Sequence, residues 1–169
     1  MANVSFSLFC EYLRELDQIV GRAPQTPSED FSYYEEIVSS DCTEWIDIWA
    51  YGERFPVGFL IISKEPNCHP DADFFIQESY IKPKFRRQGL MTSATSKFIE
   101  EHEGVYCLFV LNNNANAYRF WHNFFTKLNY QPYELEDICT NTDICSQYGF
   151  APQKMLHKRK NILRKGKEK

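Results

Sequence analysis

Hydrophobic residues recur along this chain with two different periods, and the changes between them divide it into helices and strands. Helical spacing predicts an amphipathic helix over residues 5–20, and a capping-box sequence at residues 26–29 predicts a second helix that runs to about residue 40. Two later helices are expected over 90–103, ended by a cap at Gly104, and over 115–128. Apolar and β-branched runs predict strands over residues 44–51, 56–63, 73–81, 105–111, 132–137 and 153–158, with a long connection over 138–151 between the last two.

The helix expected over 115–128 has a continuous apolar face. Its apolar positions follow the spacing i, i+3, i+4, i+7, i+8 and i+11: Ala117, Phe120, Trp121, Phe124, Phe125 and Leu128. We therefore expect this face, including Trp121 and Phe125, to pack against the sheet as part of the core.

Composition indicates one globular domain. With 169 residues, of which 43% are hydrophobic, the chain can bury a core, and we expect one domain over residues 1–160 and a basic tail over 161–169. No apolar run approaches the roughly 20 residues of a membrane span, and the first residues lack a basic start, so a cytoplasmic protein is expected. The six cysteines contain no C-x-x-C pair and the four histidines are dispersed, which predicts reduced thiols and no metal site.

Charge is distributed unevenly. From Lys158 onward there are seven Lys or Arg residues against one Glu, whereas positions 1–157 hold twelve basic and twenty-two acidic residues. Such an acidic body makes a nucleic-acid partner unlikely and favours a cationic ligand. The alternatives are that the acidic residues only solubilise the surface, or that the basic tail binds RNA.

A basic loop with one glycine lies between the strand expected at 73–81 and the helix expected at 90–103. It reads Ile81-Lys82-Pro83-Lys84-Phe85-Arg86-Arg87-Gln88-Gly89-Leu90-Met91-Thr92. A helix start offers free backbone N–H groups and the positive end of the helix dipole, so this loop is suited to a phosphate group. It has neither the three glycines of a dinucleotide-binding turn nor the Gly-Lys-Ser/Thr ending of a P-loop.

The string Arg86-x-x-Gly89-x-Met91 resembles the coenzyme A pyrophosphate loop of the GNAT superfamily of N-acetyltransferases, Arg/Gln-x-x-Gly-x-Gly/Ala, with Ile81 at the position of its preceding Val or Ile. Downstream, the run from Val110 to Trp121 (VLNNNANAYRFW) resembles the family's V-x-x-x-N-x-x-A segment, and Leu-Asn-Tyr at 128–130 matches its Leu-Gly-Phe helix exit. The resemblance covers roughly residues 44 to 160. It implies an α/β (α+β) fold with a central, mixed, mostly antiparallel sheet that has splayed parallel strands and is flanked by helices.

The resemblance also implies which residues hold acetyl-CoA, the expected co-substrate. They are the strand end, the loop and the start of the later helix: Tyr80, Ile81, Lys82, Arg86, Arg87, Gln88, Gly89, Leu90, Met91, Thr92, Asn114 and Ala117. Two positions depart from the family pattern. Met91 replaces a small residue, so its side chain must turn away from the phosphates. The family's proton-donating tyrosine aligns with either Trp121 or Phe125, and neither has a hydroxyl.

Acetyl transfer to an amine requires a base, because a free alkylamine with a pKa near 10.4 is protonated at neutral pH. The resemblance places such a base near the end of the strand before the loop, where Glu78 is the first candidate and Asp73 the second. Simple strand alternation puts Glu78 and Ile81 on opposite faces unless a bulge intervenes. Tyr118 or Tyr80 could protonate the leaving thiolate, and a backbone N–H at Tyr80 or Ile81 could stabilise the oxyanion.

The leading hypothesis is an acetyl-CoA-dependent N-acetyltransferase that acts on a primary amine of a small molecule or peptide. Acceptor specificity is expected in the two N-terminal helices and in the connection over 138–151, and a homodimer is left open. Two alternatives are a non-catalytic acyl-CoA-binding module of the same fold and a nucleic-acid-associated protein that uses its basic tail.

Overall fold

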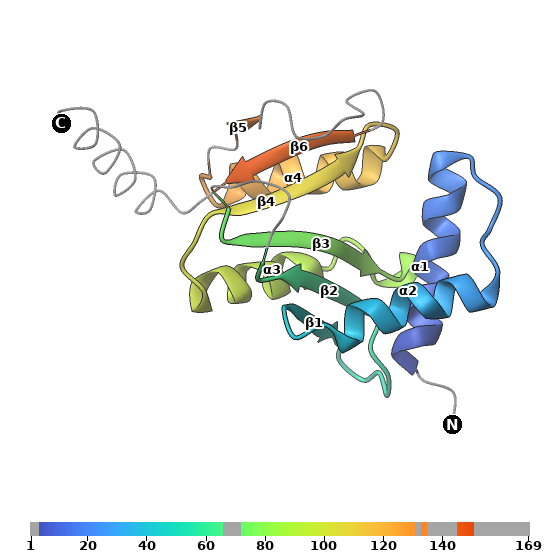
Figure 1. The fold of residues 1–169 in the computed structure, drawn as a ribbon. Coiled ribbons are helices and arrows are strands. Elements are labelled where there is room, and N and C mark those ends of the chain that lie inside the picture. The colour runs from blue at the N-terminus through green and yellow to red at the C-terminus, as the bar shows by residue number, and fades with distance from the viewer. Residues whose placement is uncertain (1–3, 66–71, 131–132, 135–144, 151–169) are drawn as a thin grey trace. The chain divides into compact units, whose positions relative to one another are not determined.

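The computed structural model describes residues 4–65, 72–130, 133–134 and 145–150 (Figure 1). The chain forms two compact units. The first unit comprises residues 1–65 and 76–97, and the second comprises residues 66–75 and 98–169. We consider each unit by itself. In the described residues, no helix combines the length and the apolar character that crossing a membrane requires.

The first unit contains the two N-terminal helices, three strands and the start of a third helix. Its elements are α1 (Val4–Val20), α2 (Pro27–Ser39), β1 (Thr43–Ile48), β2 (Gly58–Ser63), β3 (Phe74–Ile81, from Ile76 onward), the short 3-10 helix η1 (Pro83–Phe85) and α3 (Leu90–Glu101, as far as Lys97). Each was expected from the sequence with boundaries that differ by a few residues, apart from η1, which lies inside the basic loop.

Helix α2 begins with the capping box that the sequence predicts. The Thr26 N–H donates to Glu29 Oε2 at 2.8 Å, and the Thr26 hydroxyl accepts from the Glu29 N–H at 3.4 Å. Two N–H groups that a helix start leaves unpaired are thus satisfied, with Pro27 at the first helical position where no N–H is needed.

An aromatic core joins α1 and α2 to the strands of the first unit. Phe9 of α1 is fully buried, and its ring lies within 6 Å of the rings of Tyr34, Trp45 and Phe59. Strands β1 and β2 are antiparallel, with Thr43 opposite Ser63 and Ile48 opposite Gly58. The buried members of this core come from both helices and from strands β2 and β3: Leu8, Phe9, Leu13, Tyr34, Ile37, Phe59, Ile61 and Tyr80.

The second unit contains the end of α3, strand β4 (Tyr106–Leu111), helix α4 (Ala115–Lys127), and strands β5 (Tyr133–Glu134) and β6 (Cys145–Phe150). Strand β6 lies between β4 and β5 and is antiparallel to both. Trp121 and Phe125 of α4 are buried, as the apolar face predicts. The helix ends at Lys127, Asn129 follows with a φ of 53°, and the Tyr130 N–H donates to the Phe125 carbonyl at 2.9 Å.

Three expectations about this unit are wrong. The supposed connection over 138–151 contains β6, which the sequence hides because Ser146, Gln147 and Gly149 interrupt its hydrophobic pattern, although Phe150 is fully buried. The strand predicted over 153–158 lies outside the described residues. The structure also gives Cys107 as disulfide-bonded, so the six cysteines are not all reduced.

The third wrong expectation concerns Gly104, which does not end α3 as a left-handed cap. The helix ends at Glu101, and Gly104 is absent from the residues with positive φ in the described chain. Instead, a side chain at this position would meet the Phe74 ring at 2.7 Å. Gly104 is therefore a close-packing residue.

Candidate active site

The basic loop leads from β3 into α3 through two left-handed residues. After η1, the Arg86 N–H donates to the Pro83 carbonyl at 3.3 Å, Arg87 has a φ of 63°, and Gly89 has a φ of 78°. The first N–H inside α3 to find an acceptor is that of Ser93, which donates to the Gly89 carbonyl at 2.9 Å. The preceding N–H groups at the helix start have no intrahelical acceptor, which is the arrangement that binds phosphate.

Neighbouring side chains do not cover the backbone at Gly89 in this loop. A side chain added at Gly89 would meet no atom within 4 Å, so the space beside its backbone is open. Met91 is only 9% exposed, which means that its side chain points into the protein, as its presence in a phosphate loop requires. The backbone of residues 87–92 thus fits a pyrophosphate group despite the departure at Met91.

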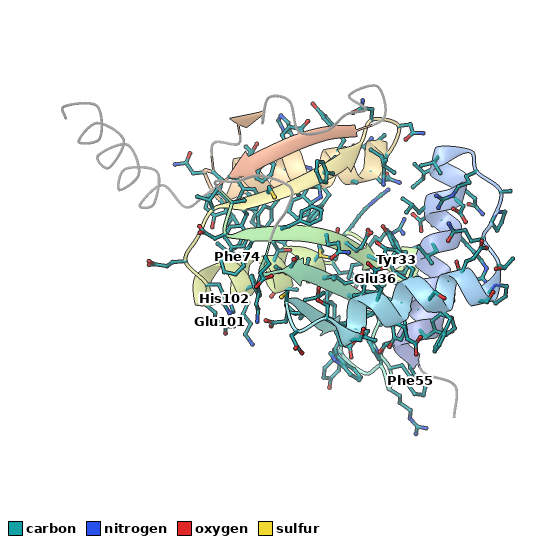
Figure 2. All side chains as sticks on the ribbon, viewed as in Figure 1. Tyr33, Glu36, Phe55, Phe74, Glu101 and His102 are labelled. Atoms are coloured by element: carbon teal, nitrogen blue, oxygen red, sulfur yellow. The ribbon has the colours of Figure 1, made fainter. Side chains whose placement is uncertain are left out.

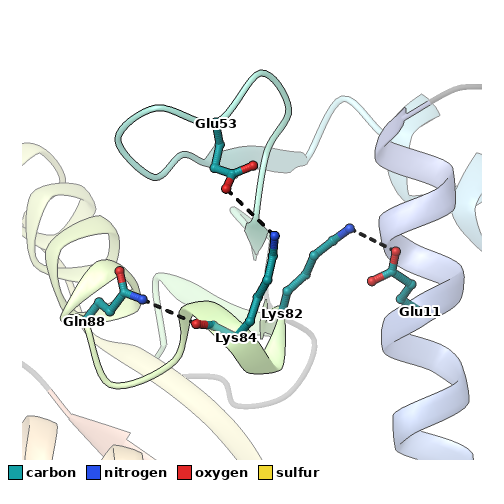
Figure 3. Close-up of polar contacts among 5 residues, drawn as sticks. All are labelled: Glu11, Glu53, Lys82, Lys84 and Gln88. Atoms are coloured by element: carbon teal, nitrogen blue, oxygen red, sulfur yellow. Dashed lines mark hydrogen bonds and ion pairs between the residues drawn. The ribbon is translucent and has the colours of Figure 1, made fainter.

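The basic side chains around the loop are paired within the first unit (Figure 3). Lys82 Nζ lies 3.0 Å from Glu11 of α1, and Lys84 Nζ lies 3.8 Å from Glu53 and over the Phe85 ring. The Gln88 side chain donates to the Lys84 carbonyl at 3.4 Å. Within the described part of the chain, Arg87 is the basic residue of this loop that forms no ion pair.

Arg86 holds the loop in place. Its Nε donates to the Ile81 carbonyl at 2.8 Å, and its Nη2 pairs with Glu15 of α1 at 2.6 Å. The guanidinium also lies over the Tyr80 ring, 5.6 Å from its centre. These contacts tie the loop to the end of β3 and to α1, so this arginine orients the backbone that follows it.

Glu78, the first candidate for the base, is half-buried on β3 and contacts both N-terminal helices. The Tyr12 hydroxyl of α1 donates to its Oε2, and the Tyr33 hydroxyl of α2 donates to its Oε1 at 2.8 Å. Glu78 therefore points toward the aromatic core, on the same side of β3 as Tyr80, whose ring lies 5.7 Å from that of Tyr12. Alternation along the strand places Ile81 on the opposite side, where it too is buried.

Burial dominates the electrostatics of this cluster. It raises the pKa of Glu78 above the ordinary value, while the hydrogen bonds from Tyr12 and Tyr33 oppose that rise. Burial, followed by the nearby Glu78 charge, raises the pKa of Tyr12 well above its usual value and that of Tyr33 likewise. Burial also raises the pKa of Tyr80 to about 12. All three phenols consequently keep their protons at neutral pH.

Asp73, the second candidate, has a structural environment in the second unit. Its Oδ2 accepts from the Val105 N–H at 2.7 Å, and its own N–H donates to the Val105 carbonyl at 2.8 Å. The adjacent Phe74 ring lies 5.8 Å from that of His102 and 5.0 Å from that of Tyr106 (Figure 2). These contacts fix the turn before β4.

The remaining candidates lie on α4 in the second unit. Asn114 caps this helix by accepting from the Ala117 N–H at 3.0 Å, and Ala117 is half-buried. Tyr118 is 50% exposed, with its ring 6.2 Å from that of His122. Sequence reasoning missed Tyr12 and Tyr33, because an aromatic residue on an amphipathic helix indicates core packing and nothing nearby in the sequence reveals a partner for its hydroxyl. The described residues contain no cluster that could hold a metal ion.

The chain belongs to the GNAT family of acetyltransferases, whose family model matches residues 9–125. The match includes α1 from Phe9 onward and all of α2, which the sequence motifs alone had left out. No curated protein sequence matches the chain.

Solved structures have the same fold at low sequence identity. An acetyltransferase from Thermus thermophilus is 15% identical with a TM-score of 0.62, and the alignment covers 86% of this chain and 87% of that one. Diaminobutyrate acetyltransferase from Paenibacillus lautus, solved with L-2,4-diaminobutyric acid and coenzyme A, is 13% identical with a TM-score of 0.56 over 87% and 89% of the two chains. The ribosomal-protein-S18-alanine N-acetyltransferase of Escherichia coli is 14% identical with a TM-score of 0.51 over 77% and 79%. The expected α/β fold is thereby confirmed as the GNAT fold.

Proposed function

We propose that this protein is an N-acetyltransferase that transfers the acetyl group of acetyl-CoA to a primary amine of a small molecule or peptide. The observation that carries the proposal is the loop of residues 86–92, where Arg87 and Gly89 adopt left-handed conformations and α3 begins with free N–H groups. When bound, acetyl-CoA supplies the thioester. The backbone of residues 87–92 would hold its pyrophosphate, with the Arg87 charge close by.

In this proposal Glu78 is the general base, because its carboxylate is the one that the N-terminal helices contact. Asp73 is second, since its Oδ2 already accepts from the Val105 backbone. Tyr118 and Tyr80 are the candidates for protonating the leaving thiolate, while Asn114 and Ala117 contribute to cofactor binding from α4. One domain over residues 1–160, a cytoplasmic location and a homodimer stay predictions.

The acceptor can be either small or a peptide. Among proteins of the same fold, one acts on diaminobutyric acid and another on the alanine of a ribosomal protein. The experiment is therefore a panel of diamines, aminoglycosides, amino acids and peptide N-termini, with thiol release from acetyl-CoA measured for each. Amine-dependent release that Gly89→Val abolishes supports the proposal.

A second candidate function is acyl-CoA binding without transfer. It is favoured by the burial of Trp121 and Phe125, which occupy the two positions that align with the family's proton-donating tyrosine and have no hydroxyl. Tight binding of acetyl-CoA in calorimetry, combined with no amine-dependent thiol release across the panel, would select this function over transfer.

A further inference from the structure

The two oxygens of Glu78 are held by hydroxyls from two different helices. The Tyr12 hydroxyl of α1 donates to Oε2 and the Tyr33 hydroxyl of α2 donates to Oε1, so both carboxyl oxygens are held by hydrogen bonds. The partners are 66 and 45 residues away in the sequence. All three residues belong to the first unit.

Ring packing determines where these hydroxyls point. The Tyr12 ring lies 5.9 Å from that of Phe9 and 5.6 Å from that of Phe59, and the Tyr33 ring lies 5.4 Å from that of Phe9. The Tyr12 ring, which also lies 5.7 Å from that of Tyr80, is held on several sides and has little rotational freedom. The Tyr33 ring is oriented by Phe9 and by its own hydrogen bond to Glu78. The donors are therefore set in position before any ligand arrives.

We propose that Tyr12 and Tyr33 are positioning residues that hold Glu78 in the orientation and ionisation state in which it accepts the proton of the acceptor amine. This inference rests on the proposed function. Each carboxylate oxygen can accept more than one hydrogen bond, so one tyrosine on each leaves capacity for the amine.

The proposed transfer begins with the loss of a proton from the acceptor. The ammonium group of the acceptor gives one proton to Glu78, and the resulting amine nitrogen attacks the acetyl carbon. The C–N bond forms while the C–S bond breaks, and its electron pair leaves with the sulfur. The second proton of the nitrogen passes to the thiolate, and Glu78 returns its proton to solvent.

Burial, and after it nearby charge, keeps both tyrosines as hydrogen-bond donors. Besides Glu78, the Glu15 charge on α1 raises the pKa of Tyr12, and the Glu36 charge on α2 raises that of Tyr33. A hydrogen bond with Gln77 lowers the pKa of Tyr33. The net pKa of each phenol is raised. Neither side chain loses its proton near neutral pH, so the hydrogen bonds to Glu78 keep their direction.

Loss of either tyrosine hydroxyl should move the pH dependence of acetyl transfer to higher pH. Both hydroxyls lower the pKa of Glu78, so removing either one leaves burial less opposed and raises that pKa further. A base must be deprotonated to act, and the acidic limb of kcat/KM therefore moves to higher pH in Tyr12→Phe and in Tyr33→Phe. A purely structural role of the two rings would leave this limb in place.

The experiment compares Tyr12→Phe and Tyr33→Phe with Tyr34→Phe in the full chain. Tyr34 is a matched control because it adjoins Tyr33 on α2 and packs in the same core, against Phe6, Phe9 and Trp45. Each variant keeps its ring, and near-UV circular dichroism verifies the fold. Carbon-13 NMR of labelled glutamate carboxyls, with the Glu78 signal assigned from its loss in Glu78→Gln, follows the titration without any turnover.

We expect the Glu78 midpoint to rise in Tyr12→Phe and Tyr33→Phe and to stay unchanged in Tyr34→Phe. With an active acceptor, each of the first two variants should lose about tenfold in kcat, as one lost hydrogen bond to a charged group implies, with the KM for acetyl-CoA unchanged. An unchanged Glu78 titration midpoint in both variants, or acetyl transfer at the wild-type rate in both, would overturn this inference and leave the proposed function standing. Failure of the wild type to transfer acetyl to any amine overturns the proposed function and, with it, the catalytic part of the inference.

Discussion

A carboxylate and a glycine lie near each end of strand β3, but in opposite environments. At the end that leads to the basic loop, Glu78 accepts hydrogen bonds from two tyrosine hydroxyls. Gly89, in that loop, has a left-handed backbone beside open space. At the start, Asp73 holds the Val105 N–H, and Gly104 is packed against Phe74. A carboxylate or a glycine near a candidate site therefore identifies chemistry only when its contacts are known.

Gly89 and Gly104 are required for different physical reasons. Gly89 is needed for its dihedral angles, because a φ of 78° is strained for other residues, and for the approach of a ligand to its backbone. Gly104 is needed for its lack of a side chain, since the Phe74 ring occupies that space. Substitutions at these positions should fail in different assays.

The largest expected effect is a difference in turnover between substitutions at Glu78 and at Asp73. Glu78→Gln should lower turnover by roughly two to four orders of magnitude, because the general base is lost, with affinity for acetyl-CoA unchanged. Asp73→Asn should lower turnover by less than about tenfold, because its Oδ2 serves the Val105 backbone. Steady-state kinetics with an active acceptor measures both, and the reverse ranking would transfer the role of base to Asp73.

The next effect concerns the loop. Gly89→Val should weaken acetyl-CoA binding about a hundredfold, through strain at positive φ and through blocked access to the backbone. Gly21→Val is the matched control, because Gly21 has a φ of 69° and open space as well, but lies directly after α1. Calorimetry should show normal affinity for the control. Equal losses in both variants would mean that general destabilisation, and not the loop, is responsible.

A smaller effect is expected at Gly104, which packs against Phe74 at the start of β3. Gly104→Ala should lower the free energy of unfolding by about 1–3 kcal/mol, because the new methyl group overlaps the Phe74 ring, which is stacked on Tyr106. Denaturant unfolding measures the loss, and acetyl-CoA affinity at a temperature where the variant is folded should match the wild type. Loss of affinity without loss of stability would contradict a packing role.

The smallest effect tests the pairing of the basic loop. Glu11→Gln should strengthen acetyl-CoA binding about two- to fourfold, since it removes a negative charge that is 3.0 Å from Lys82 and repels the phosphates in water. The gain should shrink at high salt. Glu44→Gln is the control and should change nothing, because Glu44 of β1 forms an exposed pair with Lys64, which directly follows β2. Weaker binding by Glu11→Gln would indicate that the pair orders the loop.

Local signals in the sequence determined most of the elements. The capping box at Thr26 and the apolar stripe of α4 act over one or two helical turns, and the structure contains both. The position of the basic loop between β3 and α3 was predictable in the same way, because a glycine and a helix start are neighbours in the chain. Strand β6 was missed since its polar residues conceal a strand that exists through pairing with β4.

The sequence by itself determined the family, the loop and the candidate acids, all of which depend on the order of residues over short separations. Tertiary structure alone decided which acid meets tyrosine hydroxyls, which glycine is packed, and that Met91 turns inward. Those outcomes depend on contacts such as that between Tyr12 and Glu78, which lie 66 residues apart. No local period records such a contact, because packing of α1 and α2 against the strands creates it.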